Sequence, residues 1–324
     1  ASCTSIFNLA GKYGMTASSF MRYYWFLVVV FSWSLSITAW SPQRQLSYGR
    51  RVLRSTDPSH EPIVKLDNLE FPILYESNRL LIINKPPGIA HHNDPEEDGS
   101  LGILNLVRQQ RGGERLWGVH RLDRVTSGIL LLAKDVDMAQ ALTASFANGD
   151  IAKVYVGISK KRPSKKKQGW VQGGMVRSRD KSWRLDRTAT TGSSSSTNFA
   201  KTRFFSAPIL CQEEKFTLLL FRPYTGKTHQ LRVAAKAMGM PLWGDPIYKD
   251  GSTMTTTGST TGGMQPLRTY LHASGILIPP LLDNPNGIAL WCPPPFDDVL
   301  HESEQALPNL MRKHCDIPEV IDAM

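Results

Sequence analysis

The chain has 324 residues, of which 41% are hydrophobic and 20% charged, and its formal net charge is +10. This composition excludes a disordered or coiled-coil protein and suits one large domain or two ordinary ones. The four cysteines lie far apart without a Cys-x-x-Cys pair, which argues against a disulfide scaffold and against a structural zinc site. The positive charge predicts an anionic partner, although half of it, a net +5, belongs to residues 1–60.

Residues 1–60 have the composition of a targeting leader. An uncharged apolar stretch, residues 23–37, follows Arg22 and precedes the small residue Ala39. Serines interrupt it before it reaches the length of a membrane span, so a signal-peptide core over residues 23–39 is favoured. The next residues, 41–56, contain four arginines, several hydroxyl side chains and no acid, which is typical of a transit peptide.

The junction between these two parts, T-A-W-S-P around Trp40, resembles that of two-part leaders that direct proteins to plastids bounded by extra membranes. We therefore predict a plastid protein with no stable membrane association in its mature form. A mitochondrial address is one alternative. A secretory signal followed by a basic linker is another.

Residues 61–324 are predicted to form a single α+β domain, because strand and helix patterns alternate without a regular βαβ rhythm. The expected strands are a pair within residues 73–83 and single strands at 129–133, 151–159 and 216–221. The expected helices are residues 101–110, 136–146 and 233–238, the second of them between an N-cap at Asp135 and a stop at Gly149. Two tracts of small uncharged residues, 188–197 and 253–263, are predicted to be surface loops.

A candidate catalytic carboxylate lies in the loop before the expected strand 129–133. The loop reads G-V-H-R-L-D-R-V-T-S-G over residues 118–128, with Asp123 between Arg121 and Arg124. A loop that leads into a buried strand is a rigid platform for a reactive side chain, and flanking arginines favour a charged carboxylate. From these residues alone, a simple turn capped by Asp123 is the commoner alternative.

A second motif, T-G-K-T-H-Q-L-R at residues 225–232, precedes the expected helix 233–238. Together with H-R-L-D-x-x-T-S-G, it resembles the motifs of the RluA-type pseudouridine synthases. The resemblance continues in chain order over about residues 70–280. Its further motifs are I-L-Y-E-S-N-R-L-L-I-I-N-K-P-P-G, K-V-Y, G-D-P-I-Y and L-H-A, at residues 73–88, 153–155, 244–248 and 271–273.

This resemblance implies a mixed, largely antiparallel sheet with a central cleft, and the isomerisation of uridine to pseudouridine in tRNA or rRNA without a cofactor or a metal. Asp123 aligns with the family's catalytic carboxylate, which could act as a nucleophile or stabilise positive charge at C1′. Arg232 aligns with its buried arginine partner, and Tyr155 with the aromatic ring that stacks on the target base. Arg121 aligns with the arginine that helps to displace the target nucleotide, and Leu271 with an apolar side chain near that ring.

Basic residues also suggest where RNA binds. Residues 151–187 contain twelve Lys or Arg and two Asp, with two tryptophans between them. This composition is expected of an RNA-contact surface, where cations follow the phosphate backbone and aromatic rings stack on bases. A solvated basic hairpin is the alternative. Within the motif at residues 225–232, a lysine stands where arginine is commoner, which keeps the charge but loses the bidentate fork. The RNA-binding lysines expected here are Lys165, Lys166, Lys167 and Lys227.

RNA, and not DNA, is the expected partner of a monomeric protein. A catalytically idle RNA-binding or chaperone module with the same fold is the alternative function. The presence of Asp123, Tyr155 and Arg232 together argues against that alternative, because an idle module has no chemical need for all three.

Overall fold

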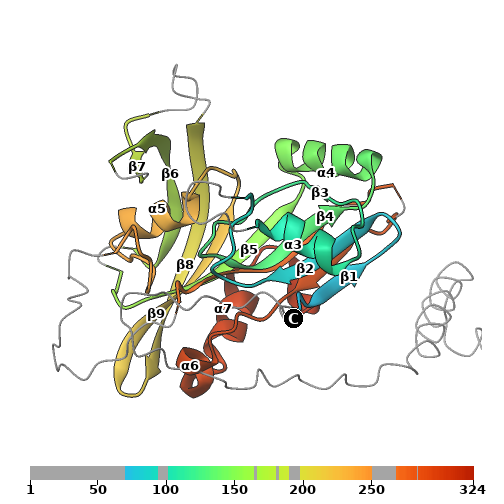
Figure 1. Ribbon diagram of the computed structural model, residues 1–324. Coiled ribbons are helices and arrows are strands. Elements are labelled where there is room, and N and C mark those ends of the chain that lie inside the picture. Colours follow the sequence, from blue (N-terminus) through green and yellow to red (C-terminus); the bar gives the residue numbers. More distant parts are fainter. Residues whose placement is uncertain are drawn as a thin grey trace, which may run out of the picture. The chain divides into compact units, whose positions relative to one another are not determined.

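One sheet forms the centre of the described part of the chain. The computed structural model describes residues 70–93, 101–163, 166–179, 182–189, 198–249, 268–282 and 284–324. The predicted leader and the predicted loop 253–263 lie outside these residues, as does most of the loop 188–197. Eleven strands of the described chain join in the order β1-β2-β4-β10-β5-β9-β8-β6-β7, with β11 paired to β10 and β3 to β4 (Figure 1).

The elements have the following bounds. The strands are β1 (Ile73–Glu76), β2 (Leu80–Lys85), β3 (Trp117–Gly118), β4 (Ser127–Ala133), β5 (Ala152–Ser159), β6 (Gln168–Arg177), β7 (Trp183–Asp186), β8 (Phe199–Cys211), β9 (Glu214–Pro223), β10 (Leu271–Ile278) and β11 (Ile288–Trp291). The helices are α3 (Ile103–Gln110), α4 (Val136–Asn148), α5 (Gln230–Ala237), α6 (Asp297–Leu300), the 3₁₀ helix η4 (His301–Ser303), α7 (Ala306–His314) and α8 (Pro318–Asp322). None of the helices described is long and apolar enough to cross a membrane.

The predicted α+β class and mixed, largely antiparallel sheet are confirmed. Among the strand pairs of the described residues, only β4 and β10 run parallel. All seven residues of β4 are buried, because Leu131 and Leu130 enter different apolar clusters on opposite faces of the sheet. A strand that is covered on both faces reads as a continuous apolar run, which is the pattern that identified it in the sequence.

Helix α4 follows its predicted local signals. The side chain of Asp135 accepts a hydrogen bond from the N–H of Met138 at 2.9 Å, which satisfies one of the helix's unpaired amide groups. Gly149 ends the helix in the left-handed conformation, with φ at 81°.

Two parts of the fold differ from the expectation. Helix α5 begins at Gln230 rather than at residue 233, because its N-cap is His229 in the left-handed conformation with φ at 54°. Strands β6, β7 and β8 and the helices after residue 296 had no strong sequence pattern. Strand β6 mixes glycines and glutamines with its apolar residues, and the last helices are three to nine residues long. Such short or weakly patterned segments acquire their structure from packing.

The two faces of the sheet are covered by different helices. On one face, α5 contributes Leu231 and Ala235 to an apolar cluster with Phe204 and Phe221 of the central strands. On the other face, α7 covers a second cluster of central-strand residues. Figure 1 shows α5 beside β6 and β8. Helix α7 packs against β8 and β9 on the opposite face of the sheet. This division separates the α5 face of the sheet from a rear face, that of α7.

Candidate active site

A pocket of about 720 Å³ opens beside α5. Its walls come from the loop before β4, from β5, from the end of β9 with the segment that follows it, and from the start of β10. Elements from distant parts of the sequence therefore meet here. Six of the predicted site residues line this one pocket, namely Arg121, Asp123, Tyr155, Lys227, Arg232 and Leu271.

The loop that carries Asp123 ends in a glycine that no other residue could replace without strain. Gly128 has φ at 112°, and a Cβ atom placed on it would lie 2.3 Å from the carbonyl oxygen of Ala273. Ala273 is the partner of Gly128 in the parallel pairing of β4 with β10. The T-S-G ending of the motif is thus explained, because only a residue without a side chain allows the two strands to approach this closely.

Lys85 fastens the K-P-P-G turn to the same loop. Its Nζ atom is buried and donates to three backbone carbonyl oxygens, at 2.8, 2.9 and 3.4 Å, the last of them that of Arg124. The carbonyl of Arg124 also accepts the N–H of Gly88 at 2.8 Å, and the guanidinium of Arg124 donates back to the carbonyl of Gly88 at 3.0 Å. Burial lowers the pKa of Lys85 to about 7, against the opposing effect of the negative charge of Asp123.

Arg232 is held chiefly by Asp245, and the ion pair with Asp123 that the resemblance implied is present as well. Its Nε and Nη2 atoms donate to the two carboxylate oxygens of Asp245 at 2.7 and 2.9 Å, and its Nη1 atom lies 3.5 Å from Oδ2 of Asp123. Burial alone would raise the pKa of Asp245. The hydrogen bonds and charge of Arg232, with the N–H groups of Tyr248 and Ile247, outweigh burial and keep the pKa below its usual value.

Tyr248 and His229 form a chain of contacts that begins at Arg232. The ring of Tyr248 lies 5.0 Å from its guanidinium carbon, and the hydroxyl of Tyr248 lies 2.8 Å from Nδ1 of His229. This hydroxyl accepts the N–H of Trp183 at 2.9 Å, so its own proton is available to Nδ1. Burial lowers the pKa of His229, against the opposing charge of Asp123, which favours a neutral ring that accepts this proton.

Tyr155 and Leu271 form the apolar wall of the pocket. They come from the paired strands β5 and β10 and belong to the same cluster as the buried residues of α5. Burial and the negative charge of Asp123 both raise the pKa of Tyr155, so its phenol stays protonated and its ring is an uncharged surface. A flat base can stack on such a surface.

Comparison with known proteins decides the family. The RNA pseudouridylate synthase family matches residues 79–237. An uncharacterized RNA pseudouridine synthase of Haemophilus influenzae is 39% identical over 206 residues, which cover 64% of this chain and 81% of that protein. The chain belongs to the RNA pseudouridine synthases. Its enzyme class is therefore that of an isomerase.

Two further relatives agree with this assignment. The ribosomal large subunit pseudouridine synthase C of Vibrio parahaemolyticus is 33% identical over 213 residues, which cover 65% of this chain and 62% of that protein. The solved structure of human RNA pseudouridylate synthase domain containing 4 matches with a TM-score of 0.55 at 26% identity, over 72% of this chain and 93% of that one. The RluA-type family and the fold that the motifs predicted are thus confirmed.

The predicted RNA-binding residues of this synthase are not all in one place. Arg121 is exposed at the rim of the pocket, and Lys227 is half-buried in its lining. Lys166 and Lys167 are exposed but do not line the pocket; Lys167 lies instead beside a separate hollow between β8 and α7. Lys165 lies outside the described residues.

Four residues of the site had no role in the sequence analysis, namely Lys85, His229, Asp245 and Tyr248. All four stand inside the quoted motifs, so a signal for their importance was present. Their contacts join segments far apart in the chain, and no spacing in the sequence indicates which of them meet.

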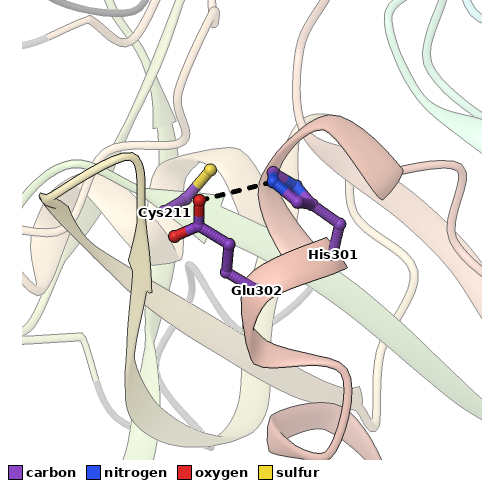
Figure 2. A group of neighbouring side chains, drawn as sticks. All are labelled: Cys211, His301 and Glu302. Atoms are coloured by element: carbon purple, nitrogen blue, oxygen red, sulfur yellow. Dashed lines mark ion pairs between the residues drawn. The ribbon is translucent and has the colours of Figure 1, made fainter.

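A separate cluster lies at the turn between β8 and β9 (Figure 2). The side chains of Cys211, His301 and Glu302 bring their possible metal-ligand atoms within 4.8 Å of one another. Each of them also has a partner in the protein. Cys211 Sγ lies 3.4 Å from the carbonyl oxygen of Asp298, and the Glu302 carboxylate accepts the N–H of Gln212 at 2.9 Å and lies 3.4 Å from the ring of His301. These contacts fasten the β8–β9 turn to α6 and η4.

Proposed function

We propose that this synthase isomerises uridines in structured tRNA or rRNA and that Asp123 is its catalytic carboxylate. The observation that carries the proposal is the position of Asp123. Its side chain is 18% exposed, faces the pocket that Tyr155 and Leu271 line, and lies 3.5 Å from the buried guanidinium of Arg232. The buried guanidinium gives this carboxylate a cationic partner, and a charged carboxylate is what a nucleophile or a stabiliser of positive charge at C1′ requires.

The reaction rearranges atoms within one nucleotide. The bond between N1 of uracil and C1′ of the ribose breaks, and a bond between C5 and C1′ forms. The proton at C5 leaves and N1 gains one, so atoms and electrons balance without an oxidant or a reductant. While it is detached, the uracil has to turn. The uncharged ring of Tyr155 and the side chain of Leu271 supply a flat apolar wall on which it can do so.

The target nucleotide must leave its base stack before it reaches this pocket, which costs a few kcal/mol. Arg121 supports such a step, because its exposed side chain stands at the pocket rim beside the catalytic loop. A cation at that place can compensate part of the cost by contacting the phosphates on either side of the displaced nucleotide. Lys227 supplies a second positive charge in the same lining.

The test compares Asp123→Asn with Asp137→Asn, the same change at a carboxylate on the surface of α4 whose side chain is 78% exposed. The substrates are tRNA and rRNA transcripts with tritium at C5 of uridine, because C5 loses its hydrogen in the reaction. We expect Asp123→Asn to release no tritium while binding the RNA as tightly as wild type, since phosphate contacts supply most of the affinity. Near-normal release by Asp123→Asn would refute the catalytic assignment, and release from neither RNA class by wild type would refute the substrate class.

We also propose that residues 1–60 direct the protein to a plastid. The support is the apolar core over residues 23–39 followed by an arginine-rich segment without acids.

A further inference from the structure

An aromatic and cationic cluster lies on the rear face of the sheet. In the ladder of β6, β8 and β9, Trp170 pairs with Arg203, and Arg203 pairs with Arg222. The two residues that follow Arg203 show which face this is. Phe204 packs against α5 on the α5 face, whereas Phe205 joins the cluster under α7. Because side chains alternate along a strand, Trp170, Arg203 and Arg222 share the face of Phe205.

Two exposed aromatic rings meet in this cluster. The ring centroids of Trp170 and Tyr224 are 5.1 Å apart, and the two residues are 46% and 39% exposed. Of the large hydrophobic side chains that are exposed in the described part of the chain, these two are the aromatic ones. Exposed aromatic rings that lie side by side offer a flat apolar surface on which a base can stack.

Three cations surround the two rings. Lys201 Nζ lies 4.6 Å from the ring centroid of Trp170 and 5.7 Å from that of Tyr224. The guanidinium carbon of Arg222 lies 4.9 Å from the centroid of Tyr224, and that of Arg203 lies 5.7 Å from the centroid of Trp170. Flat π faces beside positive charges are the combination that binds a base together with its phosphate.

The cluster is continuous with the catalytic pocket. Tyr224 directly follows the last residue of β9, and both Tyr224 and Arg222 line the pocket that contains Asp123. The N–H of Tyr224 donates to the carbonyl oxygen of Lys201 at 2.9 Å, which holds the ring beside β8. A strand of RNA that leaves the pocket around the end of β9 therefore reaches these rings next.

We propose that Trp170 and Tyr224 form a stacking platform for an unpaired base of the RNA that flanks the target uridine, with Lys201, Arg203 and Arg222 around its phosphates. This inference depends on the proposed function, because the RNA is the substrate of the pocket. It places part of the substrate on the rear face of the sheet.

Asp316 offsets part of the positive charge of this platform. Its carboxylate forms ion pairs with Arg222 and, at 3.8 Å, with Arg203, and its side chain is 42% exposed. A phosphate that binds the two arginines has to compete with this carboxylate. Removing the charge of Asp316 is therefore expected to strengthen RNA binding.

The test measures the Kd of the full chain for a fluorescein-labelled single-stranded oligouridylate of about twelve nucleotides by anisotropy. Trp170→Ala is expected to weaken binding about tenfold or more, and Trp170→Phe, which keeps a flat ring, by less than about threefold. Leu210→Ala is the control, because Leu210 lies in β8 and is 47% exposed. Asp316→Asn is expected to tighten binding about twofold to fivefold and to steepen its dependence on salt.

Tritium release separates this inference from the proposed function. Trp170→Ala should raise KM and leave kcat unchanged, whereas Asp123→Asn should lose turnover and keep the Kd of wild type. The platform is refuted if Trp170→Ala binds as Leu210→Ala does, which is also the result expected if the cluster docks a protein instead of RNA. It is equally refuted if Asp316→Asn binds no more tightly than wild type. Tighter binding by this variant, the expected result, cannot be caused by misfolding. Turnover by Asp123→Asn would overturn the catalytic assignment and leave these affinities interpretable.

Discussion

Replacing Asp245 with asparagine tests how the active-site arginine is held. Arg232 has a side chain that is 3% exposed, and that of Asp245 is 0% exposed. Removing one partner of a buried ion pair costs about 3–5 kcal/mol when the remaining charge is left without compensation, but Arg232 would keep its weaker pair with Asp123 at 3.5 Å. Asparagine keeps an oxygen for the two amide N–H groups at Asp245, so the lower end, about 3 kcal/mol, is expected. Turnover should fall about a hundredfold, since Arg232 would shift relative to Asp123.

The assay is urea unfolding of the variant beside a matched control, Asp135→Asn. The Arg79–Asp135 pair has the same two-bond geometry, at 2.7 and 2.8 Å, but its side chains are 30% and 35% exposed. Asparagine is also a good N-cap, so α4 keeps its start. Solvent screens such a pair, and the control is expected to lose far less stability than Asp245→Asn.

The contribution of Asp245 to the free energy of unfolding depends on pH, and the sign of this dependence is definite. The pKa of Asp245 is below its usual value of 3.8 in the folded protein, so its contribution to stability is complete above pH 3.8 and is lost as the pH falls through the folded value. The stability difference between wild type and Asp245→Asn should therefore stay constant between pH 7 and pH 5 and narrow as the pH falls below 3.8. Equal losses in the two variants at pH 7, or a difference that does not change with pH, would contradict the account of Arg232 as a charge held by burial and pairing.

Two further predictions concern the catalytic loop and the leader. The pKa of Lys85 is lowered from 10.5 to about 7 by burial, so the unfolded chain binds more protons between these values and the stability of wild type should rise with pH across them. Lys85→Met should lack this rise in urea unfolding at pH 7 and pH 9.5, and an unchanged profile would show that Lys85 does not titrate there. A fluorescent reporter fused to residues 1–60 should enter the plastid, and replacing Trp40 with alanine should block import or divert it. A reporter that stays in the cytosol or reaches mitochondria would exclude the two-part leader.

Local sequence signals determined several parts of this protein. Helix α4 starts at the cap Asp135 and stops at Gly149 because each residue meets the needs of its own helix end. The apolar run of β4 indicated a strand covered on both faces, and the ordered motifs indicated the family and the carboxylate Asp123. These features depend on residues that are neighbours in the chain, so their pattern can be recognised without a structure.

Tertiary structure alone decided which residues meet. The resemblance implied the ion pair of Arg232 with Asp123, which is present at 3.5 Å, but only the fold shows that Arg232 also forms a bidentate pair with Asp245. Trp170 and Tyr224 likewise come together only through the order and register of β6, β8 and β9. A shift of one residue in any of these strands would move such side chains to the other face. Contacts of this kind depend on strand order and register across the whole sheet, which no local spacing of residues encodes.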